Sequence, residues 1–205
     1  MSRFARPLPS GLDHLDELAA PLAALRAEAP RLEAWGGRLA GILQGGGRLL
    51  AAGNGGSAAQ AAHLTAELVG RYRDDRPAFS AIALIAEPCA LSAIGNDYGG
   101  DQIFARQVEG HGRVGDVLLC LSTSGRSPNL LTAVEAGRRC GLETWALCGR
   151  PGSPLERACD EALCVDAPHT ATVQEVHLIA VHLLCAAFEH ALAGTVVPLG
   201  LAEAR

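Results

Sequence analysis

Short apolar runs alternate with helical patterns along this chain, and the alternation restricts the folds that it can adopt. The apolar runs are Arg48–Ala52, Ala81–Ala86, Val117–Leu121, Glu143–Cys148 and Ala162–Val165. Such runs are typical of parallel strands that are buried on both faces. The helical patterns are Ala58–Tyr72, Pro88–Ile94, Gln102–Glu109, Leu130–Arg139, Leu155–Cys159 and Ala171–Leu192. Because right-handed crossovers connect parallel strands, we predict an α/β fold whose sheet has helices on both faces.

The N-terminal region differs from the rest, because residues 1–44 carry helical patterns without a strand. Ser10 is placed to cap a first helix, Pro21 predicts a kink or break in it, and Pro30 separates it from a second helix. We expect these helices to form a hairpin with an apolar face for a partner subunit. Residues 45–205 carry the strand–helix alternation, and no low-complexity linker divides the two parts.

Composition excludes several classes of function. The 205 residues carry a net charge of −5 with no basic run, which argues against nucleic-acid binding. All 17 basic residues are arginine, so lysine Schiff-base chemistry and a Walker-type nucleotide loop are excluded. We find no signal-peptide pattern and expect no apolar stretch of transmembrane length. The seven cysteines form no CxxC pair, and we therefore expect a cytoplasmic protein without membrane contact.

A hydroxyl-rich turn, Ser122–Ser127, lies between an apolar run and the helix that opens at Pro128. The first turn of a helix offers free backbone N–H groups and the positive end of the helix dipole. Together with four hydroxyls, these groups suit the binding of a phosphate monoester. The alternative is a Ser/Thr-rich turn that only caps the helix, and this stretch alone does not decide between the two.

Gly53–Ser57 takes the same position after the first apolar run. Its glycines permit a tight turn and the close approach of a ligand, but their spacing is not that of a dinucleotide fingerprint. Two hydroxyl-bearing turns, at Ser57 and Ser122, favour a binding site over a plain connection, because ligands of such folds bind at the carboxyl ends of strands. Further along, Gly95–Gly99 is expected to be a polar loop, either an ordinary turn or a contact for sugar hydroxyls.

Two helical stretches carry residues suited to acid–base work or metal binding. His63 and Glu67 are four residues apart and therefore share a helix face, although such a pair can also be a surface hydrogen bond. Gln174 and His182 are separated by about 12 Å along an ideal helix, so one ion would reach both only with difficulty. His177 remains a competing ligand, and His182 lies in an apolar stretch where a lone histidine is commonly a core residue.

These motifs, in this order, resemble those of the bacterial phosphoheptose isomerases, which are sugar isomerase (SIS) domain proteins. The resemblance covers about Gly45–Leu192 and is carried by AAGNGGS, HLTAELVGRYR, AIGNDYGGDQIF, GDVLLCLSTSGRS and VQEVHLIAVH. It implies a five-stranded parallel sheet and a homotetramer with sites at subunit contacts. It also implies the conversion of sedoheptulose 7-phosphate into D-glycero-D-manno-heptose 7-phosphate, the first step towards nucleotide-activated heptose.

The resemblance assigns roles to the residues that match the family's motifs. Its phosphate contacts match Ser57, Ser122, Thr123, Ser124 and Ser127. Its sugar contacts match Asn54, Gly55, Gly56, Asn96 and Asp97. The ligands of one zinc ion per subunit match His63, Glu67, Gln174 and His182, of which Glu67 and Gln174 are also expected to contact substrate. Glu67 and His182 match the acid–base pair as well.

The residue types fit an aldose–ketose isomerisation through an enediol or enediolate. We expect Glu67 to act as the base at carbon and His182 as the acid at oxygen, with zinc polarising the substrate oxygens. Thr172 replaces an arginine found in many relatives, which leaves the exact substrate and pathway open. Two alternatives remain: a non-catalytic SIS protein that binds the bacterial replication initiator, and an isomerase of another sugar phosphate.

Overall fold

Five parallel strands form the central sheet, in the order β2-β1-β3-β4-β5. They are β1 (Leu49–Gly53), β2 (Ala81–Ala83), β3 (Val117–Ser122), β4 (Glu143–Cys148) and β5 (Glu161–Cys164). The computed structural model describes residues 11–195, so the predicted cap at Ser10 lies outside the described residues. The predicted five-stranded parallel sheet is confirmed, although β2 ends at Ala83 instead of Ala86.

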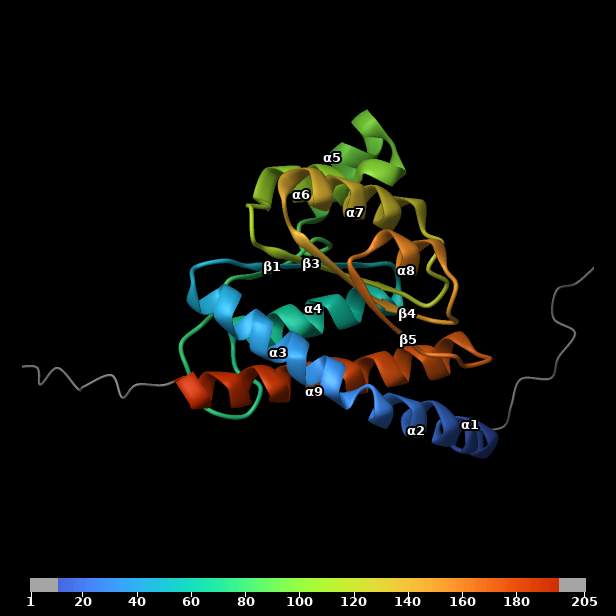
Figure 1. The fold of residues 1–205 in the computed structure, drawn as a ribbon. Coiled ribbons are helices and arrows are strands. Elements are labelled where there is room, and N and C mark those ends of the chain that lie inside the picture. Colours follow the sequence, from blue (N-terminus) through green and yellow to red (C-terminus); the bar gives the residue numbers. More distant parts are fainter. Residues whose placement is uncertain (1–10, 196–205) are drawn as a thin grey trace, which may run out of the picture.

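Helices cover both faces of the sheet (Figure 1). One layer contains α3 (Ala29–Gln44), α4 (Gly56–Val69) and α9 (Thr170–Thr195). The other contains α5 (Pro88–Tyr98), α6 (Ala105–His111), α7 (Pro128–Cys140) and α8 (Pro154–Ala158), with a short 3-10 helix at Gly100–Gln102. Successive residues of a strand pack against opposite helical layers: Leu49 belongs to one core cluster and Leu50 to the other. This burial on both faces explains why the strands are apolar throughout.

The predicted helical N-terminal region is present, but it forms three consecutive helices instead of a two-helix hairpin. These are α1 (Gly11–Glu17), α2 (Ala19–Ala27) and α3, which follow one another along α9 (Figure 1). The breaks fall at Leu18 and Glu28, and Pro21 and Pro30 lie in the first turns of α2 and α3. A proline fits there because the first N–H groups of a helix need no partner within it.

The long helix α9 packs against both other helices of its layer, α3 and α4. Its segment Thr170–Gly194 is long and apolar enough to cross a membrane, which corrects the expectation that no stretch reaches that length. In the fold, residues such as Val176, Val181 and Phe188 are buried in the core cluster that α9 shares with α3 and α4. Packing against protein therefore accounts for its apolar composition.

Candidate active site

The two hydroxyl-bearing turns lie side by side, because β1 and β3 are neighbours with Gly53 in register with Leu121. A reciprocal pair of amide hydrogen bonds joins them, with distances of 3.0 and 2.9 Å between the side chains of Asn54 and Asn129. The Gln174 side chain of α9 packs directly against Gly56, because a Cβ at position 56 would lie 2.6 Å from Nε2 of Gln174. The start of α4, the start of α7 and the first turns of α9 therefore meet at one place.

The serine turn is held by hydrogen bonds from its backbone N–H groups to its own serine hydroxyls, not by capping of α7. The Ser122 hydroxyl accepts a hydrogen bond from the Gly125 N–H at 3.0 Å, and Gly125 has φ +58°, which favours glycine. Ser127 occupies the N-cap position of α7, yet its side chain makes no capping hydrogen bond. The Ser127 hydroxyl therefore does not cap α7, which was the alternative to phosphate binding.

A small polar cavity of about 80 Å³ lies within this turn. It is lined by Asn54, Ser57, Leu121, Ser122, Thr123, Ser124, Ser127 and Gln174. Ser57 and Ser122 are almost fully buried, at 3% and 5% exposure. The cavity thus brings together all five predicted phosphate contacts with one amide from α9, and its size suits a single phosphoryl group.

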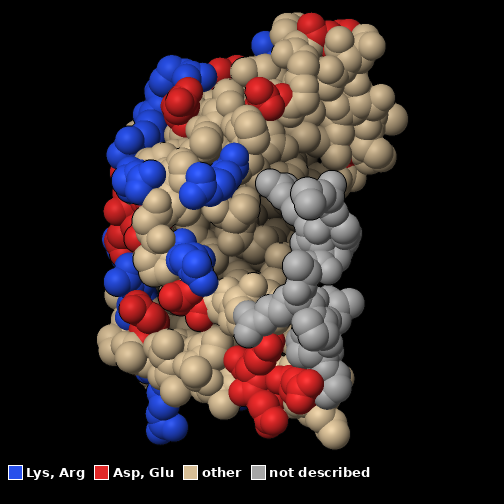
Figure 2. All heavy atoms as spheres, turned by 90° about the vertical axis from the view of Figure 1, so that its right-hand side faces the viewer, with Lys and Arg blue, Asp and Glu red and all other residues tan. Residues whose placement is uncertain are grey.

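A larger cavity of about 360 Å³ shares Thr123 and Ser124 with the first and is also lined by Arg126, Arg150 and His169. Arg150 pairs with Asp166 at 3.0 Å and His169 with Glu17 at 3.4 Å, whereas Arg126 makes no ion pair within residues 11–195. Figure 2 shows a hollow on this side of the molecule with arginine side chains beside it. The surroundings of the serine turn therefore favour an anion.

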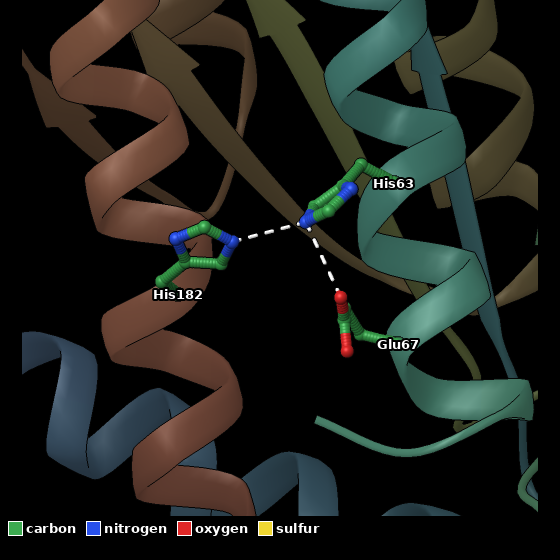
Figure 3. Close-up of side chains that lie close together, drawn as sticks. All are labelled: His63, Glu67 and His182. Carbon is green, nitrogen blue, oxygen red and sulfur yellow. Dashed lines mark hydrogen bonds and ion pairs between the residues drawn. The ribbon is translucent and has the colours of Figure 1, made fainter. Parts of the chain in front are cut away.

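His63, Glu67 and His182 converge from two helices (Figure 3). On α4, Nε2 of His63 lies 3.3 Å from Oε1 of Glu67, as expected for residues four apart. The same nitrogen lies 3.0 Å from Nε2 of His182 on α9. All three side chains are partly exposed, so they are open to a ligand as well as to one another.

The geometry of the three side chains fits a metal ion. One ligand atom from each lies within 4.8 Å of the other two. Zinc–nitrogen distances near 2.0–2.1 Å place tetrahedral ligands about 3.3 Å apart, close to the separations of 3.0 and 3.3 Å around His63 Nε2. Two imidazoles and one carboxylate with an open fourth position are typical of a catalytic zinc site.

The two other candidate ligands on α9 lie elsewhere. His177 is fully buried and its Nε2 is 2.9 Å from the carbonyl oxygen of Cys148, so it faces the sheet. Burial lowers the pKa of His177 to about 4. The side chain of Gln174 lies against Gly56 in the small cavity, and Gln174 as a metal ligand stays a prediction.

Asn96 and Asp97 are not in a loop, because α5 continues to Tyr98. The glycine that ends the segment, Gly99, has φ +90° and terminates the helix instead. Both residues are exposed, α5 buries none of its residues, and neither lines the two cavities around the serine turn. Within the described chain they are therefore separate from the other predicted sugar contacts.

Two residues at the site were not singled out from the sequence. Asn129 joins the two turns, and Tyr72 stacks on His182 with ring centroids 5.6 Å apart at an angle of 28°. Tyr72 fell in a predicted helix, whereas α4 ends at Val69 and leaves Tyr72 in the following loop. Long-range contacts of this kind leave no periodic signal in a sequence.

Comparison with known proteins identifies the family. The SIS domain model matches residues 13–149. A phosphoheptose isomerase from Streptomyces coelicolor is 64% identical over 184 residues, which cover 90% of this chain and 80% of the relative. The chain belongs to the phosphoheptose isomerases of the SIS domain family.

Solved structures of phosphoheptose isomerases agree with this membership. The one from Neisseria gonorrhoeae has a TM-score of 0.80 and 36% identity, covering 87% of this chain and 96% of that protein. The one from Francisella tularensis has a TM-score of 0.78 and 33% identity, covering 89% of this chain and 100% of that protein. The sheet and its helical layers are thus those of the family.

Proposed function

We propose that this phosphoheptose isomerase converts sedoheptulose 7-phosphate into D-glycero-D-manno-heptose 7-phosphate, the first step towards nucleotide-activated heptose. One observation carries the proposal: α4 and α9 each contribute to both the small polar cavity and the histidine cluster. Ser57 precedes His63 by about 9 Å of helix, and Gln174 precedes His182 by about 12 Å. A substrate with a phosphoryl group at one end and a carbonyl at the other suits two sites separated in this way.

The phosphoryl end is assigned to the serine turn. Ser57, Ser122, Thr123, Ser124 and Ser127 line the cavity and supply hydroxyls, and the positive end of the α7 dipole lies at Ser127. These donors are neutral, so Arg126 at the adjoining cavity would supply the positive charge that a phosphate dianion favours. Anchoring this end holds the carbonyl end in place for reaction. Asn54, Gly55 and Gly56 are proposed to contact the sugar.

Glu67 and His182 are assigned the proton transfers. The Glu67 carboxylate removes the proton from C1 while the Nδ1–H of His182, whose Nε2 faces His63, donates a proton to the carbonyl oxygen on C2, which yields an enediol. Glu67 then delivers its proton to C2, and His182 accepts the proton of the C1 hydroxyl as the C1 carbonyl forms. The product is the aldose, and both side chains return to their starting protonation states.

We assign His63, Glu67 and His182 as protein ligands of one zinc ion per subunit. Gln174 stays a predicted fourth ligand, and its side chain would have to turn out of the small cavity to reach the ion. The support is the separation of the ligand atoms and the affinity of zinc for imidazole. When bound, zinc would act as a Lewis acid that stabilises negative charge on the substrate oxygens. His63, which contacts both other ligands, orients them for the proton transfers.

We further propose a homotetramer with sites at the subunit contacts. An apolar groove of about 430 Å³ between α3 and α9 includes Leu32 and Leu183, and Leu183 is 40% exposed. In such an assembly the outlying α5 is free to place Asn96 and Asp97 at a neighbouring subunit's site.

The seven free cysteines support a reducing, cytoplasmic location.

The test is to incubate the zinc-loaded protein with sedoheptulose 7-phosphate in D₂O and follow the products by NMR. We expect the aldose to form with deuterium at C2, because the proton that Glu67 takes from C1 exchanges with solvent before Glu67 delivers it to C2. Glu67→Gln should lower kcat at least about 100-fold while substrate still binds. Glu135→Gln, an exposed change on α7, is the matched control.

Each result decides between the candidate functions. Binding of the substrate without any conversion would favour the binding-protein alternative. Conversion of a pentose or hexulose phosphate in preference to the heptulose would favour another isomerase. Full turnover by Glu67→Gln would remove Glu67 from the mechanism.

A further inference from the structure

We propose that Tyr72, Arg76 and Glu189 are positioning residues that hold the imidazole of His182 and the end of α4 in place for the acid–base reaction. The inference rests on the proposed function of His182 and Glu67. Its support is a set of contacts around the nearly buried Arg76–Glu189 pair that joins α9, the loop after α4, and the last turn of α4.

Glu189 lies on α9 seven residues after His182, so both side chains leave the helix on the same face. Its carboxylate accepts hydrogen bonds from the backbone N–H groups of Tyr72, Arg73 and Asp74, at 3.1, 3.2 and 3.4 Å. Residues 72–74 lie outside any strand or helix, so these N–H groups take no part in a helical or sheet hydrogen-bond pattern. A single side chain of α9 therefore fixes the course of the loop that follows α4.

Arg76 completes the connection from the loop back to α4. Its Nε lies 3.3 Å from Oε1 of Glu189, and the two side chains are only 8% and 9% exposed. Its guanidinium also donates to the backbone carbonyls of Leu68, at 2.9 Å, and of Glu67. The last turn of α4, which carries Glu67, is thereby tied to α9 through a buried ion pair.

Two aromatic rings enclose the guanidinium of Arg76. It lies 5.6 Å from the ring centre of Phe79 and 5.4 Å from that of Phe188, which contact each other edge to face. Replacing a buried ion pair by apolar residues is often neutral or stabilising, so stability alone is a weak reason for this pair. The hydrogen bonds of the Arg76–Glu189 pair go to the loop after α4 and to the last turn of α4. We therefore assign the pair the role of holding these two segments in position.

The result of this arrangement is the location of the Tyr72 ring. It stacks on the imidazole of His182 with 5.6 Å between ring centres, while His63 faces the same imidazole edge to face at 5.1 Å. Tyr72 thus covers one face of the His182 ring and restricts its rotation. A shift of about 1 Å in a catalytic group can lower a rate by about 100-fold, so this restriction matters for turnover.

The first experiment compares Tyr72→Leu with Tyr72→Phe in the zinc-loaded protein. We expect Tyr72→Leu to lower kcat about tenfold with KM within twofold of wild type, because His182 loses its orientation while the phosphate contacts remain. Tyr72→Phe keeps the ring and should restore turnover. Unchanged kcat in Tyr72→Leu, or an effect on KM alone, would overturn the proposal.

A second readout is independent of turnover. In substrate-free protein, the stacked ring should shift the His182 ring-proton NMR signal upfield, and that shift should vanish in Tyr72→Leu but persist in Tyr72→Phe. The signal is identified by its absence in His182→Asn. If Tyr72→Leu leaves the His182 signal where it is in wild type, the rings are not stacked and the inference is wrong.

The third comparison tests the buried pair. Glu189→Gln replaces one of the two acceptor oxygens by an NH₂ group and removes the charge that pairs with Arg76, so at least one of the amides of Tyr72 and Asp74 should exchange with solvent at least tenfold faster. Glu109→Gln, in an exposed ion pair with Arg139, is the matched control and should leave them unchanged. Unaltered exchange in Glu189→Gln would show that the pair does not position the loop. These outcomes are separable from the proposed function, which wild-type turnover tests by itself.

Discussion

Replacing Gly125 by alanine tests whether the geometry of the serine turn matters for both stability and binding. Gly125 has φ +58°, and a residue with a Cβ costs about 1–2 kcal/mol in that conformation. Its Cβ would also lie 2.3 Å from the Oγ of Ser153 and 2.4 Å from the Cβ of Ser153. Overpacking of this kind costs about 1–3 kcal/mol. The expected loss in the free energy of unfolding is therefore about 2–5 kcal/mol.

Ser153 has no easy way to move aside. It is the N-cap of α8, where its hydroxyl accepts from the Glu156 N–H at 3.2 Å in a capping box. The displacement is therefore expected to fall on the serine turn, which would weaken its bonds to phosphate. We predict a KM at least about tenfold higher, the equivalent of one charge-assisted hydrogen bond.

The matched control is Gly46→Ala. Gly46 has φ +86°, but a Cβ there would meet nothing within 4 Å, so only the conformational cost of about 1–2 kcal/mol applies. At a fixed protein concentration, Tm should fall by about 4–20 °C for Gly125→Ala and by about 2–8 °C for Gly46→Ala. Equal losses of Tm in both variants, with KM unchanged in Gly125→Ala, would refute the reasoning.

Three further predictions concern the core and the metal. Burial lowers the pKa of His177 to about 4, below the value near 6.5 that it has in the unfolded chain. The unfolded state therefore takes up a proton first as the pH falls, and the free energy of unfolding decreases by up to about 3 kcal/mol between pH 6.5 and pH 4. The fall in Tm between pH 7 and pH 5 should accordingly be smaller in His177→Gln than in wild type. Trp35 stacks on Trp145 with 4.9 Å between ring centres, and Trp35→Ala should lower the free energy of unfolding in urea by about 3–5 kcal/mol; a loss below 1 kcal/mol would contradict this packing. Removal of metal by a chelator should abolish turnover, and Zn²⁺ should restore it whereas Mg²⁺ should not, because two of the proposed ligands are imidazoles.

Much of the fold could be predicted from local patterns. The apolar runs identified the strands because both faces of a parallel sheet are buried, so that Leu49 and Leu50 must both be apolar. The spacing of His63 and Glu67 placed them on one face of α4, since helical geometry is local. Local patterns failed at an exposed helix, because a helix without buried residues has no apolar face: the polar stretch up to Tyr98, predicted to be a loop, ends α5.

Tertiary structure alone decided which distant residues meet. The neighbouring positions of β1 and β3 bring the two hydroxyl-bearing turns together, and nothing in either turn encodes that pairing. The packing of α9 against α4 places His182 beside His63 and turns His177 towards the sheet, although all three histidines have similar surroundings in the sequence. Local hydrogen bonds and side-chain alternation fix each element over a few residues, whereas contacts between elements depend on how the whole core packs.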